Sequence, residues 1–122
     1  MTLEKTGAKV YLFKGDSRET LPRELKKLPK MDFIHIDGGH SYDVVKSDWE
    51  NSRKLMHERT VVMFDDYEIE EGVTKVVNEI NRAIYEIQPT TVLHVKFLPF
   101  PSVRSYTGKC VVALRGQVTA EF

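Results

Sequence analysis

The sequence predicts an α/β domain with a mostly parallel sheet and an antiparallel hairpin at its carboxyl end. Two runs of apolar and β-branched residues, 32–37 and 60–65, end abruptly in aspartate. Such runs are typical of strands buried on both faces. Segments with apolar residues at helical spacing separate them, and strands that alternate with helices favour parallel pairing with right-handed crossovers. The expected order of elements is β-α-β-α-β-α-β-β.

The first expected strand is the apolar run 9–14, which Gly15 ends. Asp16 or Ser17 can cap the helix that follows, because their side-chain oxygens accept hydrogen bonds from free backbone N–H groups. Pro22 fits only the first turn of that helix. Its apolar face has the spacing i, i+4, i+7 and consists of Leu21, Leu25 and Leu28.

A second helix follows the strand at 32–37. Its apolar face consists of Val45, Trp49, Ser52 and Met56, and Asp48 belongs to its polar side. After the strand at 60–65, Gly72 precedes a longer helix that Pro89 ends. The wide apolar stripe of this third helix consists of Val73, Val76, Val77, Ile80, Ile84 and Ile87.

The last two expected strands are residues 91–98 and 109–115. The segment 99–108 between them contains proline and glycine and reads as a hairpin loop, so the two strands should be antiparallel.

The bulk properties exclude several classes of protein. A chain of 122 residues corresponds to one domain, 1–122, and its 18 basic residues balance its 18 acidic ones. This balance indicates neither nucleic acid nor a membrane surface as a partner. Cys110 is the one cysteine and lies in an apolar run, which fits a buried strand residue in a reducing cytosol. We therefore expect a cytoplasmic protein.

Polar residues gather where two of the predicted strands end. Asp37 and His40 follow one strand, and Asp65 and Asp66 follow the next. In open α/β sheets, ligands bind beyond the carboxyl ends of the strands. These four residues are therefore candidates for a functional site.

Several motifs in order make the chain resemble a known family. They are Gly15-Asp16-Ser17, residues 32–42 with Asp37 and His40, Asp48, residues 61–67, and Gly72-Val73. Together they resemble the carboxyl-terminal two-thirds of class I S-adenosylmethionine-dependent methyltransferases, with a truncated Rossmann-like sheet. The nearest branch is that of small-molecule O-methyltransferases, which includes the macrocin and catechol enzymes.

The resemblance implies a role for each candidate residue. Asp37, Asp65 and Asp66 match the ligands of a divalent cation such as Mg²⁺, and His40 stands where the catalytic base lies in the catechol type. Independently, clustered carboxylates repel one another by roughly 4 kcal/mol per close pair at an effective dielectric near 20, and an all-oxygen site suits Mg²⁺, Mn²⁺ or Ca²⁺.

The cofactor implied by the resemblance is S-adenosylmethionine. Asp16, Ser17 and Asp37 match positions that contact it, and the implied acceptor is a small hydroxylated molecule. However, no G-x-G sequence occurs in the chain, and no acidic strand end stands where the family binds the ribose. Glycines let the backbone approach such a ligand closely. We therefore expect the chain alone to bind the cofactor weakly or not at all.

Three alternatives remain open on sequence. Asp65 and Asp66 could merely cap a turn while Asp37 caps the next helix. The chain could be a non-catalytic methyltransferase-fold module, or a metal-dependent hydrolase that uses His35, Asp37 and His40.

The two missing strands of the family sheet also predict assembly. Without them, the strand at 9–14 either pairs directly with 32–37 or leaves that strand at an open apolar edge. Open edges pair with other chains, so we expect a homodimer or a larger homo-oligomer with both strands or their flanking helices at the interface.

Overall fold

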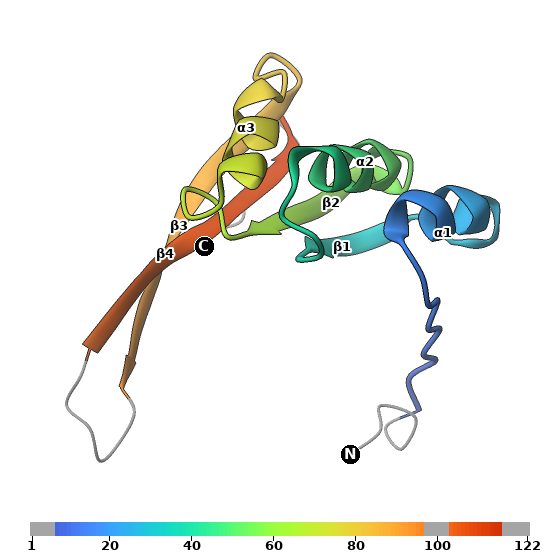
Figure 1. The fold of residues 1–122 in the computed structure, drawn as a ribbon, viewed down its shortest axis with the longest axis horizontal. Helices are drawn as coiled ribbons and strands as arrows, with labels where there is room; N and C mark the ends of the chain where they lie inside the picture. Colours follow the sequence, from blue (N-terminus) through green and yellow to red (C-terminus); the bar gives the residue numbers. More distant parts are fainter. Residues whose placement is uncertain (1–6, 97–102, 116–122) are drawn as a thin grey trace.

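The computed structural model describes residues 7–96 and 103–115 (Figure 1). Its elements in chain order are α1 (Ser17–Glu24), a 3₁₀ turn (Leu25–Lys27), β1 (Met31–Ile36), α2 (Tyr42–Arg53), β2 (Met56–Asp65), α3 (Glu71–Glu79), β3 (Tyr85–Lys96) and β4 (Val103–Leu114). Within these described residues, no helix is long and apolar enough to cross a membrane.

The four strands form one mixed sheet in the order β1-β2-β4-β3. β1 and β2 are parallel, with Ile36 opposite Phe64. β4 is antiparallel to both of its neighbours. The α/β class and the antiparallel hairpin are therefore confirmed. The expectation of a mostly parallel sheet is wrong for the described part, where β1–β2 is the one parallel pair.

Residues 9–14 do not form the predicted first strand. They adopt no regular structure, and Tyr11 and Leu12 remain 71% and 80% exposed. Figure 1 shows this segment leaving α1 on the side of the sheet that β1 borders, without joining the sheet. A strand exists only where a neighbouring backbone satisfies its N–H and C=O groups. Residues 9–14 pair with none of the described strands, so the prediction of a first strand is wrong.

Helix α1 begins directly after Asp16, whose carboxylate accepts a hydrogen bond from the Arg18 N–H at 2.9 Å. The predicted cap is therefore confirmed. Pro22 lies inside the helix rather than in its first turn. The missing proline N–H weakens a helix interior, and the helix tightens into the 3₁₀ turn shortly afterwards.

Helix α3 is shorter than its apolar stripe predicts. It ends at Glu79, and the residues from Tyr85 onward belong to β3, with Pro89 inside the strand. The register places Ile87 opposite Val112 of β4. Proline is tolerated here because β3 is an edge strand. Apolar residues at 84 and 87 fit a helix, but pairing with β4 decides their conformation.

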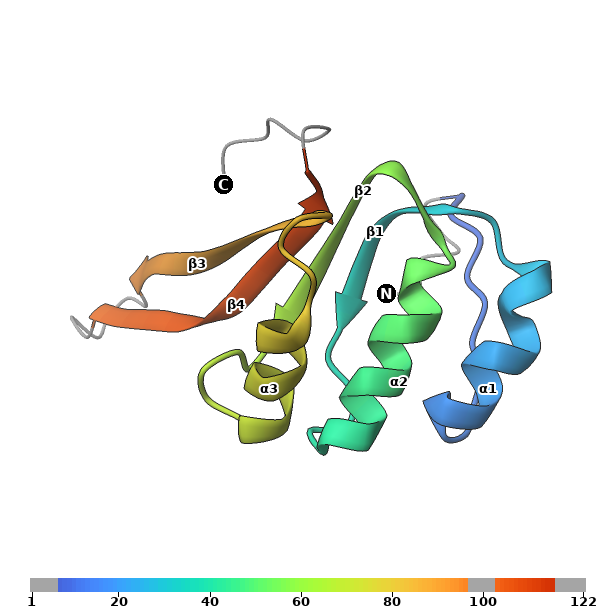
Figure 2. The same cartoon turned by 90° about the horizontal axis from the view of Figure 1, so that it is seen from above.

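The three helices lie on one face of the sheet (Figures 1 and 2). The core lies between them and the strands, where Trp49 of α2 packs 5.7 Å from the Phe64 ring and 5.2 Å from the Tyr85 ring. Cys110 is fully buried, and burial raises the pKa of its thiol to about 12. The predictions that Trp49 and Cys110 are core residues are thus confirmed. This core fixes β1 and β2 side by side and aligns their carboxyl ends.

Candidate functional site

The predicted site residues do meet at one edge of the sheet. Asp37 follows the last residue of β1, Asp65 is the last residue of β2, and Asp66 comes directly after it. His40 lies in the turn between β1 and α2. Because β1 and β2 are parallel neighbours, their carboxyl ends lie together, as the sequence predicted.

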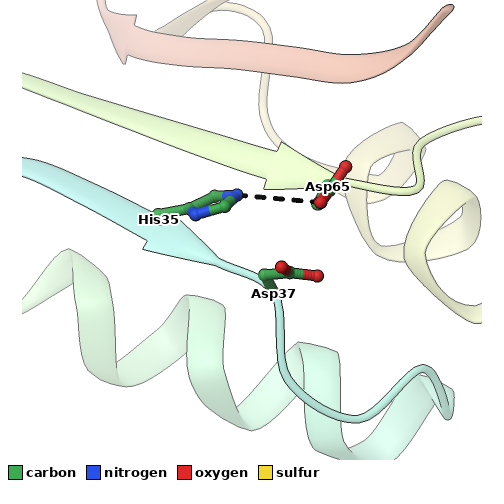
Figure 3. Close-up of side chains that lie close together, drawn as sticks. All are labelled: His35, Asp37 and Asp65. Atoms are coloured by element: carbon green, nitrogen blue, oxygen red, sulfur yellow. Dashed lines mark ion pairs between the residues drawn. The ribbon is translucent and has the colours of Figure 1, made fainter. Parts of the chain in front are cut away.

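Asp37 belongs to two groups of side chains whose ligand atoms all lie within 4.8 Å of one another. The first group is His35, Asp37 and Asp65, and the second is Asp37, His40 and Asp66. Figure 3 shows the first group, with His35 pointing from β1 toward Asp65 of β2 and Asp37 beside them. The three predicted aspartates are thus neighbours, and each group contains a histidine as well.

A lysine from β4 also enters this edge. Lys109 stands opposite Asp65 in the β2–β4 register, and its Nζ donates to Asp65 Oδ1 at 2.9 Å. The backbone N–H of Asp66 donates to the same oxygen at 3.0 Å. Burial acts to raise the pKa of Asp65, but the hydrogen bonds from Lys109 and Asp66 and the nearby charges outweigh it, so the pKa is lowered. Asp65 is therefore held as a carboxylate.

The alternative in which Asp65 and Asp66 cap a turn and Asp37 caps the next helix holds in part. Asp65 does brace the turn that follows β2 by accepting from the Asp66 N–H. Asp66 has a φ of 62°, a left-handed conformation that aspartate tolerates better than most residues. Asp37 does not cap α2, since Ser41 occupies that position. A capping role therefore accounts for Asp65 and leaves Asp37 without a structural task.

His40 is half-exposed and faces two carboxylates. Its Nε2 lies 3.0 Å from Asp66 Oδ2, and its Nδ1 lies 3.7 Å from Glu70 Oε1. A carboxylate at hydrogen-bond distance orients an imidazole and stabilises its protonated form. His40 and Asp66 therefore have the geometry of a base and its supporting carboxylate.

The amino end of α3 packs against the turn that carries His40. A Cβ built on Gly72 would lie 2.2 Å from the His40 carbonyl oxygen and 2.7 Å from the Tyr42 nitrogen. Only glycine allows two backbones to approach this closely. Gly72 thus fixes the position of His40 relative to α3, which explains its place among the motifs.

A groove of about 690 Å³ runs from these residues along β1. Its lining includes Ser17, Asp37 and Asp48, together with Leu12 and Phe13. Two of the three predicted cofactor residues, Ser17 and Asp37, therefore share one cavity. Asp16 sits beside Ser17, but its carboxylate binds the Arg18 guanidinium at 2.6 Å, and this hydrogen bond lowers the pKa of Asp16 to about 2.

Asp48 is a site residue that sequence reasoning missed. It was assigned to the polar side of α2, but it is only 8% exposed. Its Oδ1 has no hydrogen-bond partner among the described residues. Burial raises the pKa of Asp48, and a hydrogen bond from Ser17 opposes that shift. A carboxylate in this position is costly, and it offers a free acceptor oxygen in the wall of the groove.

A family model described as a methyltransferase domain matches residues 2–67, more than half of the chain. The chain belongs to this methyltransferase family. The matched range contains the predicted site residues from Asp16 to Asp66. An uncharacterised protein of Acanthamoeba polyphaga mimivirus is 28% identical over 101 residues, which cover 80% of this chain and 46% of the viral protein.

A solved structure supports the same fold for the methyltransferase chain. It is a precorrin-6y C5,15-methyltransferase from Geobacter metallireducens, with a TM-score of 0.53 and 18% identity over 90% of this chain and 55% of that one. A similarity of this level shows the fold alone, which is a truncated Rossmann-like, class I methyltransferase sheet. The chain spans about half the length of both proteins.

Two features of this candidate site required the tertiary structure. Lys109 lies 44 residues from Asp65, and only the strand register could reveal that they face each other. Asp48 is covered from the direction of α1 and the turn after β1, with its Oδ2 3.4 Å from the Cβ position of Gly38. The helical spacing of residues in α2 does not reveal that another element buries Asp48.

Proposed function

We propose that this chain forms part of an S-adenosylmethionine-dependent enzyme that methylates a hydroxyl group of a small molecule, with His40 as the base. The observation that carries this proposal is the gathering of His40, Asp37 and Asp66 at the carboxyl ends of two parallel strands in a methyltransferase fold. The acceptor class and the role of His40 are our inference from this geometry.

The reaction needs a base because a neutral hydroxyl is a poor nucleophile. S-adenosylmethionine supplies an electrophilic methyl group on a positively charged sulfur. Transfer of that methyl group to the acceptor oxygen would leave the sulfur with the electron pair of the broken methyl–sulfur bond. His40 takes the hydroxyl proton, and Asp66, 3.0 Å from His40 Nε2, stabilises the imidazolium.

We further propose that Asp37, Asp65 and Asp66 hold a divalent cation of the Mg²⁺ type. Oxygen donors from carboxylates are the ligands that Mg²⁺ and Mn²⁺ prefer, and Asp37 contributes to both groups of close ligand atoms. Such an ion would lower the pKa of an acceptor hydroxyl that it binds. The ammonium of Lys109 faces Asp65 Oδ1 at 2.9 Å, so a cation at this edge would compete with that lysine for the Asp65 carboxylate.

The cofactor would lie along the groove, whose wall includes Ser17 and Asp37. Asp48 Oδ1 is a buried acceptor that suits an N–H or O–H donor of a bound molecule. We expect affinity to be weak in the isolated chain because no G-x-G turn is present. A non-catalytic module is the second candidate function, favoured by the absence of a G-x-G sequence from residues 1–122.

We do not propose a hydrolase that uses His35, Asp37 and His40, because the family model that matches the chain is a methyltransferase domain. His35 and His40 belong to different groups of close ligand atoms that share only Asp37, and the same is true of Asp65 and Asp66.

Calorimetry and thermal unfolding with Mg²⁺, with and without S-adenosylmethionine, test the proposal. A ligand that binds only the native state raises the melting temperature, so millimolar Mg²⁺ should raise it in the wild type and not in Asp37→Ala. Asp32→Ala is the matched control, because Asp32 lies on the same strand but pairs with His57 at 2.6 Å. A melting curve unaffected by the metal would contradict the cation site. Cofactor binding of micromolar affinity would contradict the expected weakness of the isolated chain.

A further inference from the structure

Four consecutive apolar residues before α1 are exposed. Val10, Tyr11, Leu12 and Phe13 have exposed fractions of 48%, 71%, 80% and 43%. The segment adopts no regular structure, and none of the described strands pairs with it. Valine, tyrosine and phenylalanine favour strands when a partner is present. Residues 9–14 therefore have the composition of a strand, but they pair with none of the described strands.

One edge of β1 lacks a partner strand in the described part of the chain. β1 pairs with β2 on one side, and its other side has no strand partner in the described part of the chain. Exposed edges are usually protected by lysine, proline or a covering element. Residues 31–36 contain neither lysine nor proline, and Phe33 is 54% exposed.

The two features border the same hollows. Leu12 and Phe13 line the 690 Å³ groove together with Ile34 and Ile36 of β1. A second hollow of about 640 Å³ lies between Tyr11 and the start of β1 at Met31. An extended segment and an unpaired strand thus lie on either side of open space, close to each other but not paired.

We propose that a second copy of this chain fills that space, with residues 9–14 of each copy pairing along β1 of the other. Addition of a strand to an open edge is a common mode of recognition, in which backbone hydrogen bonds give affinity. Each copy has one segment to donate and one edge to accept it, so the exchange is reciprocal and closes as a two-fold dimer.

The exposed apolar area is comparable to the largest patch found on a typical monomer, and such patches are often interaction sites. With roughly 200 Å² for each aromatic side chain, the exposed parts of Tyr11, Phe13 and Phe33 amount to about 340 Å² before Val10 and Leu12 are counted. The largest apolar patch on a typical monomer is about 300–600 Å². The formal net charge of zero adds no overall repulsion between copies.

The dimer does not depend on the proposed methyl transfer, although it would place the partner's segment beside Asp37 and Asp48 in the groove. Light scattering of the whole chain after gel filtration, at micromolar concentration, should give twice the monomer mass of 14.1 kDa. Leu12→Asp should give a monomer, because Leu12 is largely exposed and its replacement leaves the core intact. Ile69→Asp, at an exposed apolar position outside this surface, should remain dimeric.

A cross-linking experiment tests the exchange itself. A tagged Tyr11→Cys chain is mixed with an untagged Phe33→Cys chain, refolded together and oxidised; Cys110 is buried and should not react. A disulfide-linked species that contains both chains supports the proposal. A folded wild-type monomer would overturn it and would leave the surface to a different polypeptide. A dimer that survives Leu12→Asp would overturn the assigned interface.

Discussion

Replacing Gly72 by alanine tests how the candidate site is held in place. An alanine methyl at this position would lie 2.2 Å from the His40 carbonyl oxygen, 2.7 Å from the Tyr42 nitrogen and 3.0 Å from the Ser41 carbonyl carbon. Ordinary contacts begin at roughly 3.5 Å. The neighbouring atoms belong to backbone rather than to flexible side-chain ends, so the turn that carries His40 has to move away from α3.

Two opposing effects set the change in the free energy of unfolding of Gly72→Ala. Alanine is favoured over glycine within a helix by up to about 1 kcal/mol, and Gly72 is the second residue of α3. Overpacking of a close contact costs about 1–3 kcal/mol and often more when backbone must shift. We expect overpacking to exceed the gain in helix propensity, with a net loss of about 2 kcal/mol in the free energy of unfolding. For a chain of this size this lowers the melting temperature by about 8 °C.

Urea unfolding gives the free energy, and the imidazole resonances of His40 report whether the ring leaves Asp66. Gly38→Ala is the matched control, because its Cβ would meet only Asp48 Oδ2 at 3.4 Å. That variant should stay within about 0.5 kcal/mol of the wild type. A Gly72→Ala protein as stable as the wild type, with unchanged His40 resonances, would refute the role assigned to this contact.

Two further predictions concern charged groups at the site. Asp48→Asn should gain stability relative to the wild type as the pH rises above about 4, the ordinary pKa of aspartate, on the order of 1 kcal/mol in all. The reason is that the pKa of Asp48 is higher in the folded protein than in the unfolded chain. The wild type therefore loses stability as the pH rises from the unfolded-state pKa toward the folded-state pKa. If urea unfolding gave the same difference between the two proteins at every pH, this reasoning would be wrong. Lys109→Met should cost about 1 kcal/mol at pH 7 because it leaves the Asp65 carboxylate without its ammonium. The lowered pKa of Asp65 gives stability above about pH 4 that is lost in acid, so the cost should shrink below pH 4. A double-mutant cycle with Asp65→Asn isolates the pair, and a coupling energy of zero would disprove the assigned interaction.

The position of the candidate site was predictable because its signals are local. Each of the two runs that became β1 and β2 carries its apolar residues and its terminal aspartate within about ten positions of sequence. Parallel pairing then brings Asp37 and Asp65 together without any further information. The roles of Lys109 and Asp48 were not predictable in this way. The lysine reaches Asp65 through the β2–β4 register, and the burial of Asp48 depends on what covers one side of α2.

The sequence by itself determined the α/β class, the strands around the site, a helix cap at Asp16 or Ser17, and the core positions of Trp49 and Cys110. These features follow from local periodicity and side-chain chemistry. Only the tertiary structure decided that the segment 84–89 belongs to a strand and a connection rather than to a helix, and that residues 9–14 stay outside the sheet. The physical reason is the same in both cases. A strand requires a neighbouring backbone to satisfy its hydrogen bonds. Tyr85 and Ile87 pair with β4, whereas residues 9–14 pair with none of the described strands.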